Sequence, residues 1–253
     1  MEAHLLSPTF VLQLFYGEER DFDLAQLCLR SNPFFGYHTL LNDSQDIAAC
    51  LKILEKYETR NIILMGHSTG CQSILYFLDR YITENKLSAD VLKYLKKCIL
   101  IGAVSDRLGL SRPPSYVLHH SEDVTEQLEQ LNDTKKEDLM LINEIMARAN
   151  PMSKFVLGKN VIKSERYLDL FQINGKDDIF SADLPDDHFK SLNRQNIPLC
   201  ILQMDQDETN LIDNTEKLKK IRNSRIKIIQ GDHCLTNGVD ELLKVLNEEV
   251  TEL

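Results

Sequence analysis

The stretch Asn61-Ile-Ile-Leu-Met-Gly66-His-Ser68-Thr-Gly70-Cys-Gln72 decides the fold. It predicts a strand, a turn with the motif G-x-S-x-G and a helix, in immediate succession. A serine on such a sharp strand-to-helix turn is held in a strained backbone conformation with its hydroxyl exposed. The motif alone is common, but the flanking strand and helix make chance the minor explanation. Ser68 is therefore the candidate nucleophile.

Three neighbours of Ser68 have predicted roles in the turn. Gly66 and Gly70 are expected because side chains there would collide with the neighbouring strand and helix. The amide of Thr69, at the start of the helix, is expected to donate a hydrogen bond to an oxyanion, helped by the positive helix end.

Short apolar runs alternate with helical stretches around this turn. Unbroken apolarity is typical of parallel strands that are covered on both faces. The predicted strands are Ala25–Leu29, Asn61–Met65, Lys97–Gly102, Ile197–Met204 and Arg225–Ile229, with Phe10–Tyr16 as a further candidate. The predicted helices are Asn42–Glu58 (capped by Asn42 or Asp43), Gly70–Tyr81, Asn214–Ile221 and Asp240–Asn247. The 253 residues are therefore expected to form one α/β domain, a mostly parallel sheet flanked by helices.

The middle of the chain, from about Arg107 to Leu170, has a different pattern. It shows no convincing strand, whereas Ser121–Asn132 and Lys136–Ala149 read as helices. An insertion placed after a central strand would lie above the carboxyl edge of the sheet, where insertions usually shape the pocket. We expect a helical lid at residues 107–170; the alternative is a helical decoration without a role in substrate choice.

A base and an acid are needed because a serine hydroxyl is a weak nucleophile. In a fold with this turn, the acid and then the histidine follow the serine, on loops after the late strands. The last predicted strand leads into Asp232-His233, so His233 is the predicted base. The strand before it leads into Asp205-Gln206-Asp207, and Asp207 is the preferred acid. The alternative acids are Asp205, then Asp177 and Asp178.

The composition limits the partners. A formal net charge of -10 argues against a nucleic-acid partner. No apolar run approaches the roughly 20 residues that cross a bilayer, and the first residues lack a basic n-region, so a cytoplasmic location is expected. None of the six cysteines has the spacing of a zinc site, and we expect reduced, mostly buried thiols. The reaction requires no metal and no organic cofactor. The oligomeric state stays open.

These motifs together resemble the fungal siderophore-esterase family of α/β-hydrolases. The similar stretches are Gly66–Gln72, Val104–Arg107, Asp177–Leu184, Asp207–Glu208, Gly231–His233, and Gly36–Leu40 with His38 where a glycine is usual. The resemblance implies an α/β-hydrolase fold and an intracellular serine esterase. Characterised members open the ester bonds of hydroxamate siderophores such as fusarinine C and its triacetyl form. A small-molecule ester, such as a ferric siderophore, is therefore the expected partner.

The chain departs from this family at its beginning. Members usually start with further strands and a Gly-Gly-Leu-type loop that supplies the second oxyanion amide. Met1–Asp23 contains only one glycine, Gly17. Either the loop Tyr16-Gly17-Glu18 serves in its place, or the chain is a member shortened at its N-terminus. The alternative function is a non-catalytic binding protein with an incomplete oxyanion hole, although retention of all three triad positions favours an enzyme.

Overall fold

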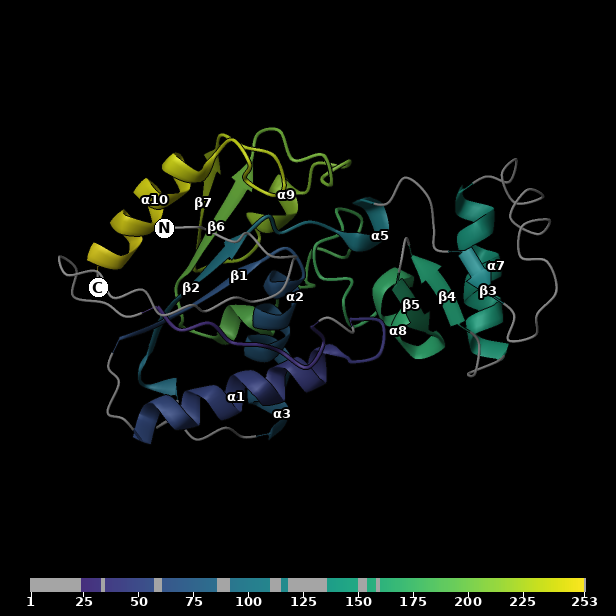
Figure 1. The fold of residues 1–253 in the computed structure, drawn as a ribbon, viewed down its shortest axis with the longest axis horizontal. Coiled ribbons are helices and arrows are strands. Elements are labelled where there is room, and N and C mark those ends of the chain that lie inside the picture. Colours follow the sequence, from purple (N-terminus) through teal and green to yellow (C-terminus); the bar gives the residue numbers. More distant parts are fainter. Residues whose placement is uncertain are drawn as a thin grey trace.

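The described residues form an α/β fold, in which a parallel sheet is flanked by helices, as predicted (Figure 1). A computed structural model describes residues 24–32, 35–56, 61–85, 92–109, 115–117, 136–149, 154–157 and 160–252. The main sheet of these residues has the strand order β1-β2-β6-β7, and each neighbouring pair is parallel. Its strands are β1 (Ile62–His67), β2 (Leu95–Ile101), β6 (Leu199–Met204) and β7 (Ser224–Ile229). They confirm four of the predicted strands, with small shifts at the ends.

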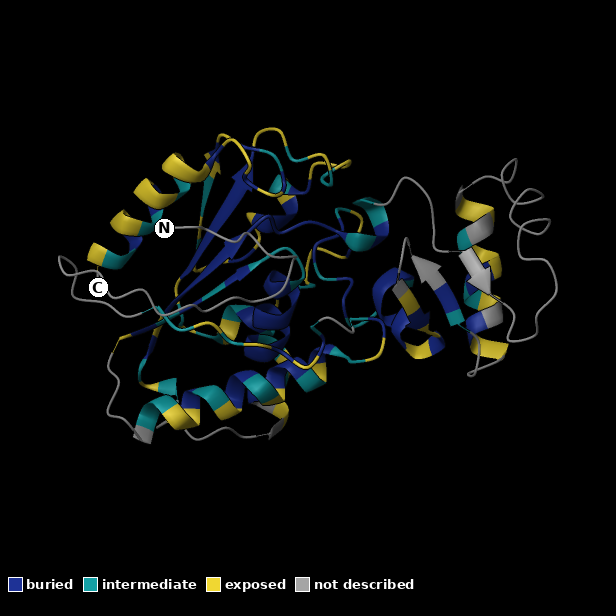
Figure 2. Cartoon of the chain, in the orientation of Figure 1, coloured by how far each residue is buried: buried dark blue, intermediate teal, exposed yellow. Residues whose placement is uncertain are grey.

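Both faces of the sheet are covered, as the unbroken apolar runs indicated. Along β2, Cys98 and Leu100 belong to the cluster packed under helices α1 (Leu40–Lys56) and α2 (Thr69–Tyr76), whereas Ile99 and Ile101 belong to a second cluster with Val245 of the C-terminal helix. Successive strand side chains point to opposite faces. The buried strands lie between helices whose outer surfaces are exposed (Figure 2).

Helix α1 (Leu40–Lys56) begins earlier than predicted, and the predicted cap is wrong. Thr39 precedes the helix, and its carbonyl accepts from the N–H groups of Asn42 and Asp43. The Asn42 side chain accepts from the Thr39 N–H, the reciprocal half of a capping box. Asp43 is buried instead, and its carboxylate accepts the hydroxyls of Ser31 and Ser73.

The other predicted helices are present with different lengths. Helix α2 (Thr69–Tyr76) continues as the π-helical turn η1 (Phe77–Tyr81) and then α3 (Ile82–Asn85). Helix α9 (Thr215–Leu218) is shorter than predicted at both ends. Asn214 precedes it and is buried, with its side chain bound to the carbonyls of Ala103 and Phe180. Helix α10 (Val239–Thr251) is longer than predicted.

The predicted strand Ala25–Leu29 is wrong. Residues 24–29 have no regular secondary structure and pair with no strand among the described residues. Leu27 and Leu29 pack toward the core, but Gln26 and Cys28 are largely exposed. The run therefore has only one buried side, unlike a central strand. The further candidate Phe10–Tyr16 lies outside the described residues.

The expectation of a purely helical insertion is also wrong. Strands β3 (Ser115–Val117), β4 (Lys154–Leu157) and β5 (Asn160–Lys163) form an antiparallel sheet, and α8 (Ser164–Phe171) follows it. Phe155 stacks on Tyr167 with ring centroids 4.2 Å apart, inside a separate small core. Strands this short bury too few residues to give a visible pattern.

The sequence also predicts two helices in the insertion, one of which lies among the described residues. Helix α7 (Lys136–Ala149) confirms the predicted helix, and Ser121–Asn132 lies outside the described residues. The short helix α5 (Asp106–Gly109) follows β2 and leads into the insertion, which sits to one side of the main sheet (Figure 1).

All six cysteines are free; Cys71, Cys98 and Cys200 are buried, whereas Cys28 and Cys234 are exposed. Among the described helices, none combines the length and the apolarity needed to cross a membrane.

A buried carboxylate attaches α10 to the sheet. The Glu249 side chain is fully buried and binds Lys97 of β2, at 2.9 Å, and Arg225 and Lys227 of β7. Burial raises the pKa of Glu249, but hydrogen bonds from Arg225, Lys97 and Lys227 outweigh it and hold the pKa at about 2. Because this pKa is below that of the unfolded chain, about 4.3, the stability from Glu249 is complete above that value. It is lost as the pH falls toward 2.

Replacing Glu249 by glutamine should therefore lower the free energy of unfolding at pH 7 by about 3 kcal/mol, because three cations lose their buried partner. The loss of stability between pH 4.5 and pH 2 should become shallower. Urea unfolding at several pH values measures both effects. Glu248→Gln is the matched control, since Glu248 makes an exposed pair with Lys227 and should cost less than about 1 kcal/mol. Equal losses in the two variants would contradict the role given to Glu249.

Candidate active site

Ser68 sits on a tight turn between β1 and α2. Its backbone has φ 53° and ψ −122°, a conformation that is strained for a residue with a side chain. The Ser68 N–H donates to the carbonyl of Ile101, and the Ser68 carbonyl accepts from Cys71 N–H, so the turn is attached on both sides. The predicted strand, turn and helix are all present.

The turn requires a glycine at position 66. A Cβ on Gly66 would lie 2.6 Å from the backbone carbon and oxygen of Gly70. Strand and helix backbones therefore touch at these two glycines, which is the close approach that the motif predicted.

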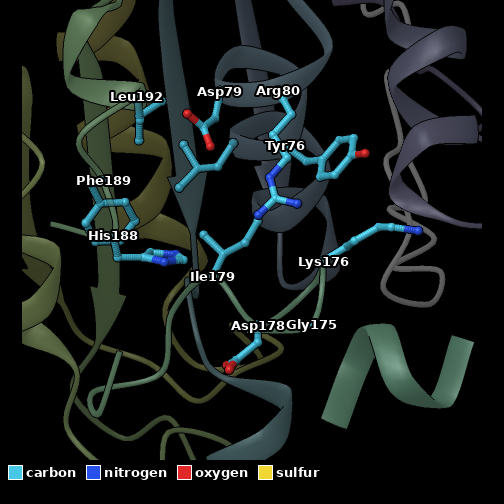
Figure 3. Close-up of a pocket in the computed structure, with 11 residues that line it drawn as sticks. Tyr76, Asp79, Arg80, Gly175, Lys176, Asp178, Ile179, His188, Phe189 and Leu192 are labelled. Atoms are coloured by element: carbon cyan, nitrogen blue, oxygen red, sulfur yellow. The ribbon is translucent and has the colours of Figure 1, made fainter. Parts of the chain in front are cut away.

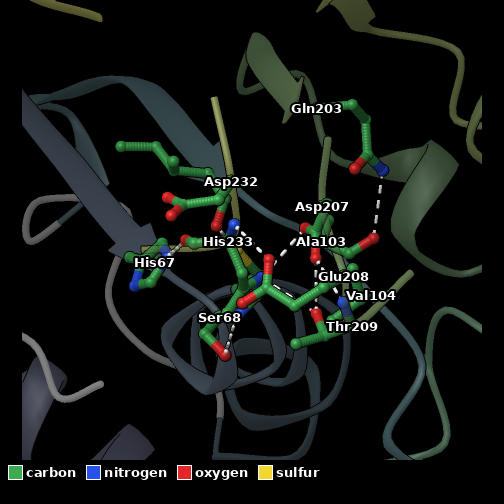
Figure 4. Close-up of polar contacts among 12 residues, drawn as sticks. His67, Ser68, Ala103, Val104, Gln203, Asp207, Glu208, Thr209, Asp232 and His233 are labelled. Atoms are coloured by element: carbon green, nitrogen blue, oxygen red, sulfur yellow. Dashed lines mark hydrogen bonds and ion pairs between the residues drawn. The ribbon is translucent and has the colours of Figure 1, made fainter. Parts of the chain in front are cut away.

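His233 lies on the loop after β7, directly over Ser68 (Figure 4). Its Nε2 is 2.9 Å from the Ser68 hydroxyl oxygen, and its Nδ1 is 2.9 Å from Asp207 Oδ2. Gly102, at the end of β2, has φ 64°, and a Cβ there would come within 3.2 Å of the His233 ring. A glycine at this strand end leaves room for the imidazole.

Asp207 lies on the loop after β6, and its side chain is only 1% exposed. Burial raises the pKa of Asp207, but hydrogen bonds from His233 and Thr209 outweigh it and hold the pKa below its ordinary value. The carboxylate therefore stays ionised at neutral pH, as an acceptor for His233 Nδ1–H.

The alternative acids do not contact His233. Asp205 is exposed, and its Oδ1 accepts the Gly231 N–H at 2.9 Å, which joins the acid loop to the histidine loop. Asp177 and Asp178 are buried and form ion pairs with Arg166 and Arg107, respectively. The structure thus gives these three carboxylates structural partners.

Two further residues support the histidine loop. Glu208 accepts the His233 backbone N–H at 3.0 Å, and His67 Nε2 donates to the His233 carbonyl at 2.7 Å. Burial lowers the pKa of His67, which favours its neutral form. The sequence shows these two residues only as neighbours of Asp207 and Ser68. It does not predict their contacts, because no spacing rule relates a side chain to the backbone of a distant loop.

Thr69 is the first residue of α2, so its N–H has no acceptor within the helix. This amide is next to Ser68, at the positive end of the helix, where the sequence predicts a donor to an oxyanion. The loop Tyr16-Gly17-Glu18, considered for the second amide, lies outside the described residues.

Two of the other stretches that resemble the family, Val104–Arg107 and Asp177–Leu184, contact each other. Arg107 of α5 donates to Asp178 at 3.0 Å and also binds Asp183. Gln72 of α2 donates to Asp106 at 2.8 Å. Burial first, then repulsion by Asp177, raises the pKa of Asp106 to about 7. These contacts hold the loop after β2 against the segment that precedes β6.

A small pocket lies along the C-terminal part of α2 (Figure 3). Arg80, Asp178 and His188 line it from three different segments, and Arg80 also lies over the Tyr76 ring. Burial lowers the pKa of His188. None of its lining residues belongs to the hydrogen-bonded chain of Ser68, His233 and Asp207.

The chain is similar in sequence to known proteins. Residues 12–239 match the family described as "Protein of unknown function (DUF1749)". A UPF0613 protein of Schizosaccharomyces pombe is 32% identical over 133 residues, which cover 53% of this chain and 37% of that protein. Fusarinine C esterase sidJ of Aspergillus fumigatus is 26% identical over 216 residues, which cover 73% of this chain and 57% of that protein. The chain therefore spans less than two thirds of the length of either relative.

A solved structure is also similar. The esterase domain of a Rhodothermus marinus protein superimposes with a TM-score of 0.42 and 18% identity, covering 78% of this chain and 62% of that chain.

The strain at Ser68 predicts a measurable effect on stability. Ser68→Gly should be more stable than Ser68→Ala by about 1 kcal/mol, because only glycine adopts this conformation without a Cβ clash. The larger conformational entropy of glycine in the unfolded chain offsets part of this gain. Both variants lack the hydroxyl, so the comparison isolates the backbone. Chemical unfolding of the two variants provides the test. A glycine variant no more stable than the alanine variant would show that the turn is unstrained.

Proposed function

The chain belongs to the family described as "Protein of unknown function (DUF1749)", and we propose that it is a serine hydrolase that cleaves carboxylic esters. One observation carries this proposal: a strained turn presents the Ser68 hydroxyl 2.9 Å from His233 Nε2, while Asp207 lies 2.9 Å from Nδ1 of the same ring.

In the proposed reaction, Ser68 attacks the ester carbonyl as His233 Nε2 takes the hydroxyl proton. The ionised Asp207 holds the proton of His233 on Nδ1 and stabilises the imidazolium that forms. The Thr69 N–H donates to the developing oxyanion. His233 then returns the proton to the leaving alcohol. Water, activated by the same histidine, releases the acid and regenerates Ser68.

A different function, a binding protein that keeps the fold without turnover, is motivated by the sequence of residues 1–23. This segment contains a single glycine, Gly17, where the resembling family uses a glycine-rich oxyanion loop. Loss of one oxyanion donor costs roughly 10²–10³ in rate. Measurement of turnover separates the two functions.

The purified protein should hydrolyse a short-chain p-nitrophenyl ester. Ser68→Ala and His233→Ala should each lower kcat at least about 10³-fold, because the nucleophile and its base act as one unit. A fluorophosphonate probe should label the wild type at Ser68 and leave Ser68→Ala unlabelled. A folded wild type with neither turnover nor labelling would favour the binding protein.

The two candidate acids provide a matched control for this experiment. Asp207→Asn should lower kcat about 10³–10⁴-fold, because an amide cannot hold the proton on His233 Nδ1. Asp205→Asn keeps an oxygen for the Gly231 N–H and should lower kcat about 10-fold or less. The reverse order would assign the acid role to Asp205.

We propose that the substrate is a hydroxamate siderophore ester of the fusarinine type. We propose further that the protein cleaves it in the cytoplasm. Two observations support this class: the resemblance of the motifs around Ser68, Asp207 and His233, and the similarity to an esterase named for fusarinine C. A bulky substrate with several ester bonds needs a larger binding surface than the Ser68 turn and the loops of Asp207 and His233 provide. We therefore propose that residues 107–170 act as the lid of the pocket.

Replacing residues 121–149 by a short linker should then lower kcat/KM for ferric fusarinine C more than for p-nitrophenyl acetate, because only the bulky ester reaches the insertion. Release of iron measures the first reaction and absorbance of p-nitrophenolate the second. Equal losses on both substrates would contradict the lid. A wild type that cleaves the small ester but not fusarinine C would reject the siderophore while leaving the esterase intact.

A further inference from the structure

The two oxygens of the Asp207 carboxylate have different partners. Oδ2 is 2.9 Å from His233 Nδ1. Oδ1 accepts the Thr209 hydroxyl at 2.6 Å and the Thr209 backbone N–H at 2.9 Å. A carboxylate turns easily about its last torsion, so the bonds to Oδ1 decide where Oδ2 points.

The Thr209 hydroxyl also lies beside the histidine (Figure 4). Its oxygen is 2.9 Å from His233 Nδ1. A hydroxyl has one proton to donate, and an ionised carboxylate can only accept, so that proton goes to Asp207 Oδ1. The lone pairs of the hydroxyl then face Nδ1. They can accept only if Nδ1 carries its proton, which leaves Nε2 free to take the proton of Ser68.

We propose that Thr209 is a positioning residue of the triad: its hydroxyl orients the Asp207 carboxylate and holds the His233 tautomer that serves as a base toward Ser68. This inference rests on the proposed esterase function. These contacts of Thr209 are with Asp207 and His233 and not with Ser68, so its effect passes through the acid and the base. Hydrogen bonds to the carboxylate also oppose the effect of burial on the pKa of Asp207.

The chain contains a matched pair elsewhere. Asp213 and Thr215 have the same spacing, and the Thr215 N–H donates to Asp213 Oδ1 at 2.9 Å, the same distance as in the Asp207–Thr209 pair. The hydroxyl of Thr215 also contributes to lowering the pKa of Asp213. Asp213 is exposed and no histidine is among the partners that the structure gives for it. Thr215→Val therefore removes the same local contact away from the triad.

The experiment compares Thr209→Val, Thr209→Ser and Thr215→Val with the wild type, on a p-nitrophenyl ester. Thr209→Val should lower kcat about 10- to 100-fold and change KM less than about 2-fold, because a misplaced base affects the chemical step rather than binding. Thr209→Ser keeps the hydroxyl and should stay within about 3-fold of the wild type. Thr215→Val should match the wild type.

Proton NMR supplies a second measurement. The Nδ1–H resonance of His233, far downfield in the wild type and in Thr209→Ser, should shift or broaden in Thr209→Val. If the valine variant fails to fold, Thr209→Ala removes the same hydroxyl in a smaller side chain. A folded Thr209→Val with wild-type kcat, or a serine variant as impaired as the valine variant, would overturn the inference. A wild type without turnover would instead reject the esterase proposal on which it rests.

Discussion

The contact between the backbones of Gly66 and Gly70 is the constraint on which the site depends. Because a Cβ at position 66 would lie 2.6 Å from the Gly70 backbone, the strand and the helix can meet only with glycine there. The chain must reverse within the few residues between them. Ser68 therefore takes φ 53° and projects its hydroxyl from the end of β1. The hydrogen bonds of the turn to Ile101 and Cys71 hold this conformation in place.

The parallel sheet then determines what Ser68 meets. The carboxyl ends of parallel strands lie at one edge, so the loops after β6 and β7 reach the same place as the turn after β1. Asp207 and His233 come from those two loops. Side-chain contacts with the loop backbones, from Asp205 to Gly231 and from Glu208 to His233, keep the loops at a fixed distance. The hydrogen-bonded chain of Ser68, His233 and Asp207 is stable in a partly buried site because each of these side chains has a partner.

Farther from the site, ion pairs also hold separate elements together. Glu249 attaches α10 to β2 and β7, and Arg107 attaches α5 to the loop before β6. A buried carboxylate without a cation would be costly, so each pair also specifies which elements may lie together. Asp177 and Asp178 were candidates for the acid because of their sequence position. Their burial beside Arg166 and Arg107 explains why they pair with those cations rather than with His233.

The sequence by itself determined the α/β architecture, four strands of the main sheet and the turn at Ser68, because apolar runs and glycine spacing are local properties. It also predicted that Asp207 and His233 follow the last two strands of the sheet, as they do here, because the order of the strands along the chain shows which loop each residue lies on. It failed where the information is not local. The strands β3, β4 and β5 are three or four residues long and are stabilised by pairing with each other. Only the tertiary structure showed that Asp205 accepts a backbone N–H and that the Thr209 hydroxyl contacts both Asp207 and His233. These contacts depend on the directions of side chains in loops, where the sequence has no repeating pattern.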